Sequence, residues 1–461
     1  MPAYVVGMAK ANLVADAVVI GMGPGGEEVA LKLAESGLDV IGIDRGLLGG
    51  ECPYWGCIPS KMMIRAGNLL AEARRIPGMA GDASVSPDWA PVAARVRDAT
   101  DNWDDRVAVE RFEGKGGRFL RGDGRLLGPG RVEVGDTTIE AGRAVVIATG
   151  TGPNIPPVPG LAGVAYWTNR EAIEATEVPG SLAVLGGGAV GLELAQVFAR
   201  FGCDVTVIEA MDRLLPPEEP EVHDLIRPIL EREGVTVHVG AKAQRVREDG
   251  GRLVVDLEQG PAVAADRLLV ATGRRADLDA VGMPSVGIDG QLRALPVDEH
   301  LRVAPGIWAV GDITGKGAFT HTAMYQAGIA VADILGRAHG PAEYHAVPRV
   351  TFTDPEVGSV GQTEAAARAA GVSTRTGMAQ IPTSARGWIH KAGNEGLIKL
   401  VEDARRGVLV GATSAGPTGG EVLGLLSLAV HAAVPTDRLR QMIYAYPTFH
   451  RAIEHALMEL G

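Results

Sequence analysis

Short runs of apolar residues that end at a glycine recur along this chain. Four such runs cover residues 14–20, 144–148, 181–185 and 267–271, and a glycine follows each run within two positions. Apolar runs of this length, bounded by turn residues, are typical of strands buried on both faces of a parallel sheet. A helix is expected after the first run, over about residues 26–36, and a further strand over residues 39–43. The pattern therefore predicts an α/β fold.

The first apolar run leads into a glycine-rich turn with the spacing of a dinucleotide-binding βαβ unit. Gly21 makes the tight turn, Gly23 lets the backbone approach a pyrophosphate, and Gly26 lets the helix pack closely on the strand. The helix start offers N–H groups and a partial positive charge to the phosphates. Asp44, at the end of the next strand, is placed to accept hydrogen bonds from ribose hydroxyls. These features together predict a nucleotide site.

The same arrangement returns at a constant offset of 165 residues. Gly186, Gly188, Gly191 and Glu209 then correspond to Gly21, Gly23, Gly26 and Asp44, and no gap is needed. The repeat predicts two dinucleotide sites. A carboxylate at residue 209 favours the free ribose hydroxyl of NADH over the phosphate of NADPH, although the nearby Arg213 leaves NADPH possible.

Composition narrows the class of protein. The chain has 461 residues, of which 46% are hydrophobic and 22% charged, as in ordinary globular proteins of several domains. A formal net charge of −12, without a run of basic residues, argues against a nucleic-acid partner. The sequence has no signal-peptide pattern and no apolar run of about eighteen residues, so we expect a cytoplasmic protein with no membrane segment.

Two of the three cysteines, Cys52 and Cys57, lie five positions apart. In an ideal helix this spacing gives about 7.5 Å of axial rise, whereas bridged cysteines need Cα atoms closer than about 7 Å. A bond between them therefore requires a distorted helix start, which Pro53 and Gly56 permit. The spacing alone leaves open a redox-active pair, two unpaired thiols or half of a metal site. Lys61 follows Cys57 by one helical turn.

With both nucleotide modules in view, the chain resembles the class I pyridine nucleotide-disulfide oxidoreductases. This family of flavoproteins includes dihydrolipoamide dehydrogenase, glutathione reductase and mercuric reductase. The resemblance rests on the two modules and on the CxxxxC pair followed by Ile-Pro-Ser-Lys. Residues 306–312 also resemble the second flavin motif, and residues 350–358 the start of the dimerisation domain.

The resemblance implies two Rossmann-like domains, for FAD and NAD(P), and an α+β dimerisation domain at the C-terminus. The implied division is an FAD-binding domain in two parts, an NAD(P)-binding domain between them and a dimerisation domain, over residues 1–152 and 275–345, 153–274, and 346–461. It further implies a homodimeric enzyme without a metal site.

The resemblance also implies roles for individual residues. Electrons would pass from NADH or NADPH through FAD to a Cys52–Cys57 disulfide, and then to a small-molecule substrate. Cys57 would form the charge-transfer thiolate beside the flavin, Cys52 would exchange with substrate, and Lys61 and Glu193 would form an ion pair near the flavin. Placement at a helix start would lower the pKa of Cys57. Asp312 would hold the ribityl chain, and the remaining cofactor contacts would come from Gly50, Thr149, Gly150, Gly311 and Gly273.

One motif departs from the family pattern. Glutathione and lipoamide enzymes end in His-x-His-Pro-Thr-x-x-Glu, whose second His is the acid/base and whose Glu orients it. Here Tyr446 stands at the base position and Arg451 at that of the Glu. A tyrosine, with an ordinary pKa near 10, is a poor base but can still give a proton to a leaving thiolate. Arg451 would attract an anionic substrate or lower the pKa of Tyr446.

The departure makes lipoamide reduction less expected. Mercuric reductases carry a cysteine pair near the C-terminus that hands the metal inward. The last eight residues here contain no cysteine, which disfavours mercury reduction. The leading hypothesis is an FAD-dependent NAD(P)H:disulfide oxidoreductase. One alternative reduces quinones or other acceptors at the flavin, and another is a redox sensor with little turnover. Tyr54 and Trp55, between the cysteines, would either stack on a flat substrate or serve packing.

Overall fold

The computed structural model describes residues 11–460. The first ten residues lie outside the described residues, as does Gly461. They hold the start of the predicted first domain and the first half of the N-terminal stretch that has no signal-peptide pattern. The chain forms two compact units, one built from residues up to 57 with 100–152 and 274–343, the other from residues 58–99, 153–273 and 344–461. The finer division into FAD, NAD(P) and dimerisation segments stays a prediction.

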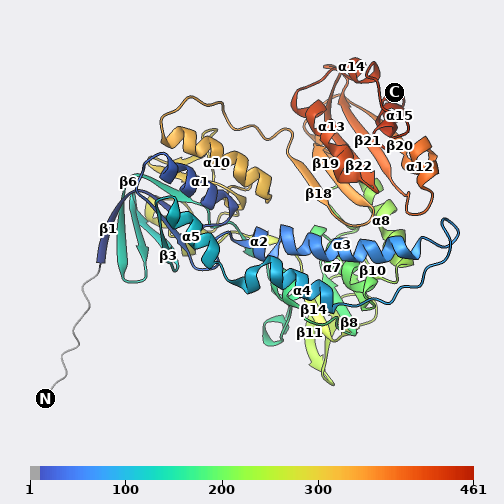
Figure 1. Cartoon of the computed structure of the whole chain (residues 1–461), viewed down its shortest axis with the longest axis horizontal. Helices are drawn as coiled ribbons and strands as arrows, with labels where there is room; N and C mark the ends of the chain where they lie inside the picture. Colours follow the sequence, from blue (N-terminus) through green and yellow to red (C-terminus); the bar gives the residue numbers. More distant parts are fainter. Residues whose placement is uncertain (1–10, 461) are drawn as a thin grey trace. The chain divides into compact units, whose positions relative to one another are not determined.

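The first unit is built on an eight-stranded sheet that contains the first predicted βαβ unit (Figure 1). Val18 of the central strand β1 pairs in parallel with Ile41 on one side and with Val145 on the other. The strand β1 begins three residues earlier than predicted, at Ala11. In order across the sheet the strands are β16 (Arg302–Ala304), β17 (Ile307–Ala309), β6 (Thr137–Ile147), β1 (Ala11–Ile20), β2 (Val40–Asp44) and β3 (Gly117–Arg121), with β4 (Gly124–Gly128) and β5 (Arg131–Val134) as a hairpin on β6.

Apolar side chains cover both faces of this sheet. On one face Val29 and Leu33 of α1 (Pro24–Glu35) pack with Ala327 and Val331 of α10 (Thr320–Ile334), and Figure 1 shows the two helices side by side. The other face is covered by the hairpin, α9 (Leu278–Val281) and η3 (Met283–Val286). The remaining helices of this unit are α2 (Glu51–Trp55), η1 (Asp101–Trp103), α5 (Arg106–Gly114) and η4 (Asp312–Thr314).

The second unit contains the repeat of the nucleotide module. Its parallel sheet has the strand order β10 (Thr236–His238), β9 (Asp204–Ile208), β8 (Ser181–Leu185) and β14 (Arg267–Val270). A smaller antiparallel sheet is formed by β11 (Ala243–Asp249), β12 (Arg252–Leu257) and β13 (Val263–Ala265). The helices are α3 (Cys57–Arg74), α4 (Ala90–Ala99), α6 (Asn169–Glu174), α7 (Ala189–Arg200) and α8 (Pro220–Arg232).

The C-terminal part of the second unit is an antiparallel sheet with helices on it, as predicted. Val422 and Leu426 of α13 and Ile453 and Leu457 of α15 pack on the sheet. The strand order is β18 (Pro348–Thr351), β19 (Glu356–Gly361), β22 (Val408–Gly416), β21 (Leu397–Asp403) and β20 (Thr374–Gln380). The helices are α11 (Glu364–Ala369), η5 (Ile381–Thr383), α12 (Ala385–His390), α13 (Gly419–His431), α14 (Thr436–Arg440) and α15 (Arg451–Met458).

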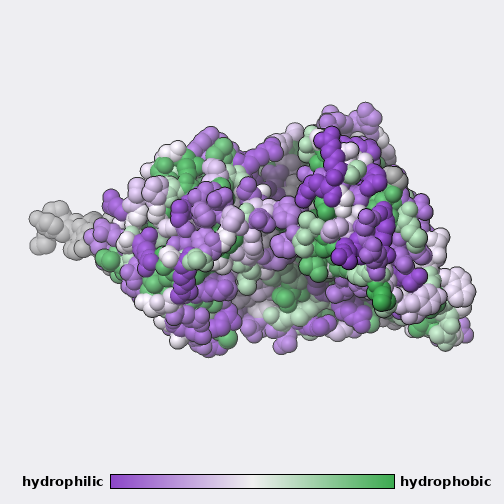
Figure 2. All heavy atoms as spheres, turned by 90° about the horizontal axis from the view of Figure 1, so that it is seen from above, coloured by the Kyte–Doolittle hydropathy of each residue, from purple (hydrophilic) through white to green (hydrophobic). Residues whose placement is uncertain are grey.

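No helix within residues 11–460 is both long enough and apolar enough to cross a bilayer. On the face drawn in Figure 2 hydrophilic residues predominate, and hydrophobic residues form small separate patches.

Candidate active site

The cysteine pair lies where two helices meet at a break. The short helix α2 ends at Trp55, and α3 begins at Cys57. Gly56, between them, has φ −130° and ψ −116°, which is outside the helical region. Gly50 precedes α2 with φ 66°, a conformation that favours glycine. The helix start is therefore distorted at the glycine that the cysteine spacing had singled out, and this break brings the two cysteines together.

The two thiols are in hydrogen-bonding contact but are not joined by a disulfide. The hydrogen bond to Cys57 and partial burial raise the pKa of the Cys52 thiol well above its usual value. Cys52 therefore keeps its proton, which is available to a thiolate on Cys57. The hydroxyl of Thr320, the first residue of α10, lies 3.4 Å from the Sγ of Cys57. The structure thus surrounds the Cys57 sulfur with two potential hydrogen-bond donors and a helix start, all of which favour a thiolate.

Lys61 and Glu193 form the ion pair that the family resemblance implied. The Nζ of Lys61 lies 2.8 Å from Oε2 of Glu193, whose side chain is only 7% exposed. The other carboxylate oxygen accepts a hydrogen bond of 2.8 Å from the backbone N–H of Phe352. The ammonium group also lies 4.8 Å from the centre of the Phe352 ring. Both charges are consequently fixed by two partners each, and Glu193 is not a surface residue.

The glycines of the first module have the geometry that the motif requires. Gly21 has φ +94°, and a Cβ atom there would lie 2.4 Å from the carbonyl oxygen of Ala148. A Cβ atom on Gly26 would lie 1.9 Å from the carbonyl oxygen of Gly21, so the helix packs directly on the turn. Open space surrounds the position of a Cβ on Gly23, at the start of α1, and no side chain caps that helix.

The second module repeats this geometry. Gly186 has φ +109°, and a Cβ atom on Gly191 would lie 2.1 Å from the carbonyl oxygen of Gly186. Gly188 again borders open space, and no side chain caps α7. Both helix starts therefore leave backbone N–H groups for phosphate oxygens. Gly273, which follows the last strand of this sheet, has φ +99°.

The two acids at the strand ends, Asp44 and Glu209, hold the glycine turns through hydrogen bonds. Asp44 accepts hydrogen bonds of 2.7 Å from the N–H groups of Met22 and Gly46. Glu209 accepts from the equivalent positions, at 2.6 Å from Gly187 and 2.7 Å from Met211. The offset of 165 residues thus extends to individual hydrogen bonds. A carboxylate offers about four lone-pair sites, so each acid retains capacity for ribose hydroxyls.

Asp312 lies on the turn after β17. Its carboxylate accepts a hydrogen bond of 2.9 Å from the hydroxyl of Thr151, and burial raises its pKa. Thr151 in turn accepts one of 3.0 Å from Arg274. Gly311 has φ +84°, Gly150 has φ +62°, and Thr149 is exposed beside it. The hydrogen bonds from Arg274 to Thr151 and from Thr151 to Asp312 thus hold one carboxylate oxygen of Asp312 and leave the other for a ligand.

These observations fit the two cofactors. The first module, with its glycine turn at Gly21 and Gly23, its uncapped helix start and the acids Asp44 and Asp312, fits FAD. The second module, with Gly186, Gly188, an uncapped helix start and Glu209, fits a nicotinamide dinucleotide. The individual contacts stay predictions.

The departing C-terminal motif lies at the end of the second unit. Tyr446 is 70% exposed, and the guanidinium of Arg451 lies 5.5 Å from the centre of its ring. Arg451 also lies 3.2 Å from Glu454, so part of its charge is neutralised. His450 directly precedes α15, and His455 lies within it. Tyr446 and Arg451 border a cavity of about 240 Å³.

Other residues singled out in the sequence have packing roles. Tyr54 is buried at 6% exposure and its backbone carbonyl accepts from the indole of Trp103, so it does not offer a stacking surface. Trp55 is half-buried and tilts against Tyr54 with ring centres 5.8 Å apart. Cys203 is buried, and burial raises its pKa to about 12.

Four contributors were not predicted from the sequence. Thr320 contacts Cys57, Phe352 contacts both members of the ion pair, and Thr151 with Arg274 supports Asp312. No local motif marks the two threonines, because their roles depend on tertiary placement. Phe352 did fall inside the recognised stretch at residues 350–358.

A separate cluster of described residues has metal-ligating side chains, namely His300, Asp333 and His339. Asp333 accepts hydrogen bonds from Arg302 and from the indole of Trp308. Although burial opposes the change, these hydrogen bonds lower the pKa of Asp333 to about 2. The carboxylate is thus already neutralised by a guanidinium, which accounts for the cluster as an ion-pair network.

The chain belongs to the pyridine nucleotide-disulphide oxidoreductase family. The family model of that name matches residues 15–327, and its dimerisation domain matches residues 347–457. The protein is therefore a flavin-dependent enzyme of the kind that uses FAD and a nicotinamide nucleotide, and the second match supports a homodimer.

Relatives of similar sequence identity in this family are named for different enzyme activities. A dihydrolipoyl dehydrogenase of Chlorobaculum tepidum is 35% identical, with 96% of each chain covered. A mercuric reductase of Streptomyces lividans is 33% identical, with 97% of each chain covered. Among solved structures, the Cu(II) complex of a cysteine-to-serine mutant of the HOCl-induced flavoprotein disulfide reductase RclA from Escherichia coli has a TM-score of 0.85 at 25% identity. The match covers 97% of this chain and 100% of that one.

Proposed function

We propose that this enzyme reduces a small disulfide through the Cys52–Cys57 pair, with electrons from a nicotinamide nucleotide. The observation that carries the proposal is the contact between the two thiols at the break between α2 and α3. A pair held in this way can alternate between dithiol and disulfide without rebuilding the fold, because the break supplies the distortion that a helical spacing forbids.

When bound, FAD supplies the hydride-accepting and electron-donating chemistry that links the nicotinamide to the disulfide. The chain would hold it through the turn at Gly21–Gly26 and through Asp44 and Asp312. The family resemblance would place the Lys61–Glu193 ion pair near the flavin, with the Lys61 ammonium fixed by the Glu193 carboxylate at 2.8 Å.

The thiol chemistry then balances within the chain. The Cys52 sulfur attacks one sulfur of the substrate disulfide as its proton leaves, forming a mixed disulfide and releasing the first thiolate. The proton from Cys52 ends on that released thiolate. Cys57 attacks the Cys52 sulfur, closing the internal disulfide and releasing the second thiolate. The substrate gains two electrons and the dithiol loses two. Tyr446, from the second subunit, gives its proton to a leaving thiolate in place of the family's histidine.

NADH is the proposed electron donor. Support comes from Glu209, whose carboxylate is oriented at the end of β9 by the N–H groups of Gly187 and Met211. A carboxylate there repels a ribose phosphate and accepts from a ribose hydroxyl. The ratio of kcat/KM for NADH and NADPH tests the assignment, and the variant Glu209→Ala should narrow that ratio. A cytoplasmic location is likewise proposed, since cycling thiols fit a reducing compartment.

A second candidate is reduction of quinones or Cu(II) without the cysteine pair. The absence of the usual histidine at position 446 favours it, because such acceptors need no thiol acid/base. A turnover screen of disulfides, quinones and Cu(II) separates the two candidates when it is run on wild type and on the double variant Cys52→Ser/Cys57→Ser. The disulfide proposal expects the double variant to lose disulfide turnover, and full turnover in that variant would overturn it. A turnover near zero with every acceptor would instead favour a redox sensor.

A further inference from the structure

We propose that the cavity beside Tyr446 binds an anionic group of the substrate, so that the physiological acceptor is a small disulfide bearing a carboxylate. This inference rests on the function proposed above and adds the chemical class of the substrate. We call this space the C-terminal cavity. It measures about 240 Å³ and is lined by Ser384, Ala385, Arg386, Tyr446, Pro447, Thr448, Arg451 and His455.

The lining carries an excess of positive charge. Arg386 and Arg451 contribute two guanidinium groups and His455 an imidazole, while no acidic residue lines the cavity. Glu454 lies 3.2 Å from Arg451 and neutralises part of its charge. Within residues 11–460, by contrast, the half-buried side chain of Arg386 makes neither an ion pair nor a hydrogen bond. The ring of Phe449, 5.5 Å from the guanidinium carbon, holds it in place. A half-buried guanidinium with five unused donors is well suited to a carboxylate.

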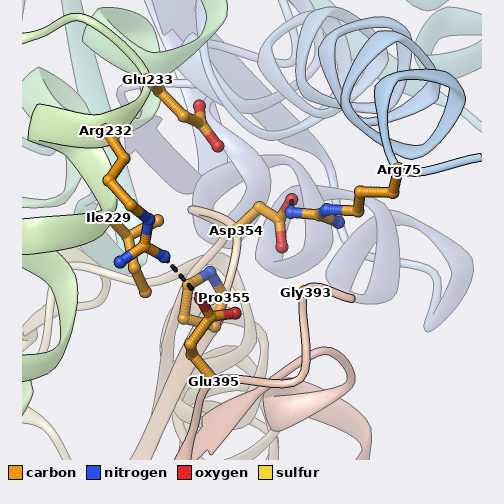
Figure 3. Close-up of a pocket in the computed structure, with 8 residues that line it drawn as sticks. All are labelled: Arg75, Ile229, Arg232, Glu233, Asp354, Pro355, Gly393 and Glu395. Atoms are coloured by element: carbon orange, nitrogen blue, oxygen red, sulfur yellow. Dashed lines mark hydrogen bonds and ion pairs between the residues drawn. The ribbon is translucent and has the colours of Figure 1, made fainter. Parts of the chain in front are cut away.

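A second cavity in the same unit has a different arrangement of charges. It measures about 170 Å³ and is lined by Arg75, Ile229, Arg232, Glu233, Asp354, Pro355, Gly393 and Glu395. Figure 3 shows Arg75 pointing toward Asp354, at 2.7 Å, and Arg232 toward Glu395. Its arginines thus already have carboxylate partners, whereas Arg386 of the C-terminal cavity has none among the described residues.

The hydroxyl groups of the C-terminal cavity narrow the recognition further. Thr448 donates to the carbonyl of Ala445 at 2.8 Å, and Ser384 donates to that of Ile381 at 2.7 Å. Their protons are therefore used within the fold. The donors that remain for a ligand are the two guanidinium groups, the His455 ring and the Tyr446 hydroxyl.

The size of the cavity sets the part of the substrate that enters. Its volume equals about eight water molecules at about 30 Å³ each. This accommodates a carboxylate on a short carbon chain and not a whole nucleotide. The acid group would lie on Arg386, which leaves the disulfide near the Tyr446 hydroxyl.

The experiment compares three linear disulfides of similar length on the FAD-loaded dimer with NADH. They are dithiodipropionate, bis(sulfonatoethyl) disulfide and the neutral bis(hydroxyethyl) disulfide. In the wild type we expect KM for the dicarboxylate to be at least about tenfold below that of the neutral compound, the equivalent of about 1.4 kcal/mol. Arg386→Gln should remove this advantage with kcat within about twofold, and Arg386→Lys should restore part of it. Arg406→Gln, in an exposed turn of the same sheet, is the matched control and should change neither value.

Binding without turnover gives a second readout. Calorimetric titration of the oxidised enzyme with adipate, a dicarboxylate that has no disulfide, should show an affinity that falls at least about tenfold in Arg386→Gln. If the sulfonate compound binds better than the carboxylate, the class of anion is wrong. Equal KM values for the charged and neutral disulfides, unaffected by Arg386→Gln, would overturn the inference while leaving the disulfide function in place.

Two further outcomes separate this inference from its foundation. If NADH bleaches the flavin but no disulfide of either charge is reduced, the proposed function fails first. If Arg386→Gln dissociates the dimer in light scattering, Arg386 is a subunit contact and the inference is overturned.

Discussion

The start of helix α3 and the segment around Tyr446 have kept the family pattern to different degrees. At α3 the cysteine pair, Lys61 and Glu193 have the residue types and the contacts that the family resemblance implies. Around Tyr446 the histidine and glutamate of the pattern are replaced by a tyrosine and by Arg451. Under the proposed function, the conserved region is the one that would receive electrons from the cofactors, and the altered region is the one that would face the substrate.

The largest effect is expected at α3. Cys57→Ser should lower disulfide turnover by roughly a thousandfold, because a serine cannot close the internal disulfide. Steady-state NADH oxidation with a disulfide acceptor measures this. Cys203→Ser is the matched control, since Cys203 is buried and has no role in the proposed thiol chemistry. Turnover above about a tenth of wild type in Cys57→Ser would show that Cys57 is not required for the reaction. The contrast between the start of α3 and the Tyr446 segment would then have no mechanistic basis.

The next effect concerns the Tyr446 side. Tyr446→Phe should reduce kcat for disulfides by about 10²-fold, the usual range for loss of a general acid. NADH-dependent reduction of quinones should be unaffected, since it needs no proton at a thiolate. Parallel assays with the two acceptors give the answer, and equal losses with both would show that the phenol acts through the fold.

The family pattern can also be restored. The double variant Tyr446→His/Arg451→Glu should gain lipoamide reduction at least about tenfold over wild type, because it supplies the base and its orienting acid. The pH profile of that gain should follow a histidine, with activity rising through about pH 6.5. Activity that stays flat in pH, or no gain at all, would show that the segment differs in more than these two positions.

Stability should respond to the ion pair at α3. Glu193→Ala leaves the Lys61 ammonium and the Phe352 N–H without their acceptor and should cost about 2–3 kcal/mol of unfolding free energy. Part of the ammonium is exposed, so the loss stays below that of a fully buried pair. Urea denaturation of the FAD-loaded enzyme measures it, with Glu395→Ala, which removes the more exposed ion pair to Arg232, as the control. A loss of unfolding free energy below about 0.5 kcal/mol would show that Glu193 contributes no more to stability than an ordinary surface carboxylate.

The smallest effect is on pH dependence. Burial raises the pKa of Cys203 from 9.0 to about 12, so the native state binds a proton that the unfolded chain releases as pH rises above 9. Its contribution to stability is therefore present below pH 9 and is lost progressively up to pH 12. Between pH 8 and pH 10 the unfolding free energy of the wild type should fall by about 1 kcal/mol more than that of Cys203→Ala, which lacks this thiol. Denaturation at pH 8 and pH 10 checks it, and identical slopes in both proteins would contradict it.

Much of this structure was predictable from the sequence because its strongest signals are local. Glycines that permit a positive φ, such as Gly21 and Gly186, fix the turns wherever they occur. Element bounds were less certain. The helix α1 begins at Pro24 and not at Gly26, since proline is favoured in the first helical turn.

What escaped prediction depends on segments distant in sequence. Thr320 reaches Cys57 from 263 residues away, and no spacing reveals such a contact. Phe352 binds Glu193 through its backbone, which any residue type offers. The sequence likewise does not reveal that the Arg386 guanidinium has no ion-pair partner among residues 11–460, because such a lack is a property of the folded chain.

The central claim is that Cys52 and Cys57 accept the electrons. The most direct test adds one equivalent of NADH anaerobically to the oxidised enzyme, blocks thiols with iodoacetamide and locates the modified cysteines by mass spectrometry. The account predicts that Cys52 and Cys57 become alkylated, that Cys203 does not, and that neither cysteine of the pair reacts before NADH is added. Full bleaching of the flavin without any newly alkylated cysteine would contradict it.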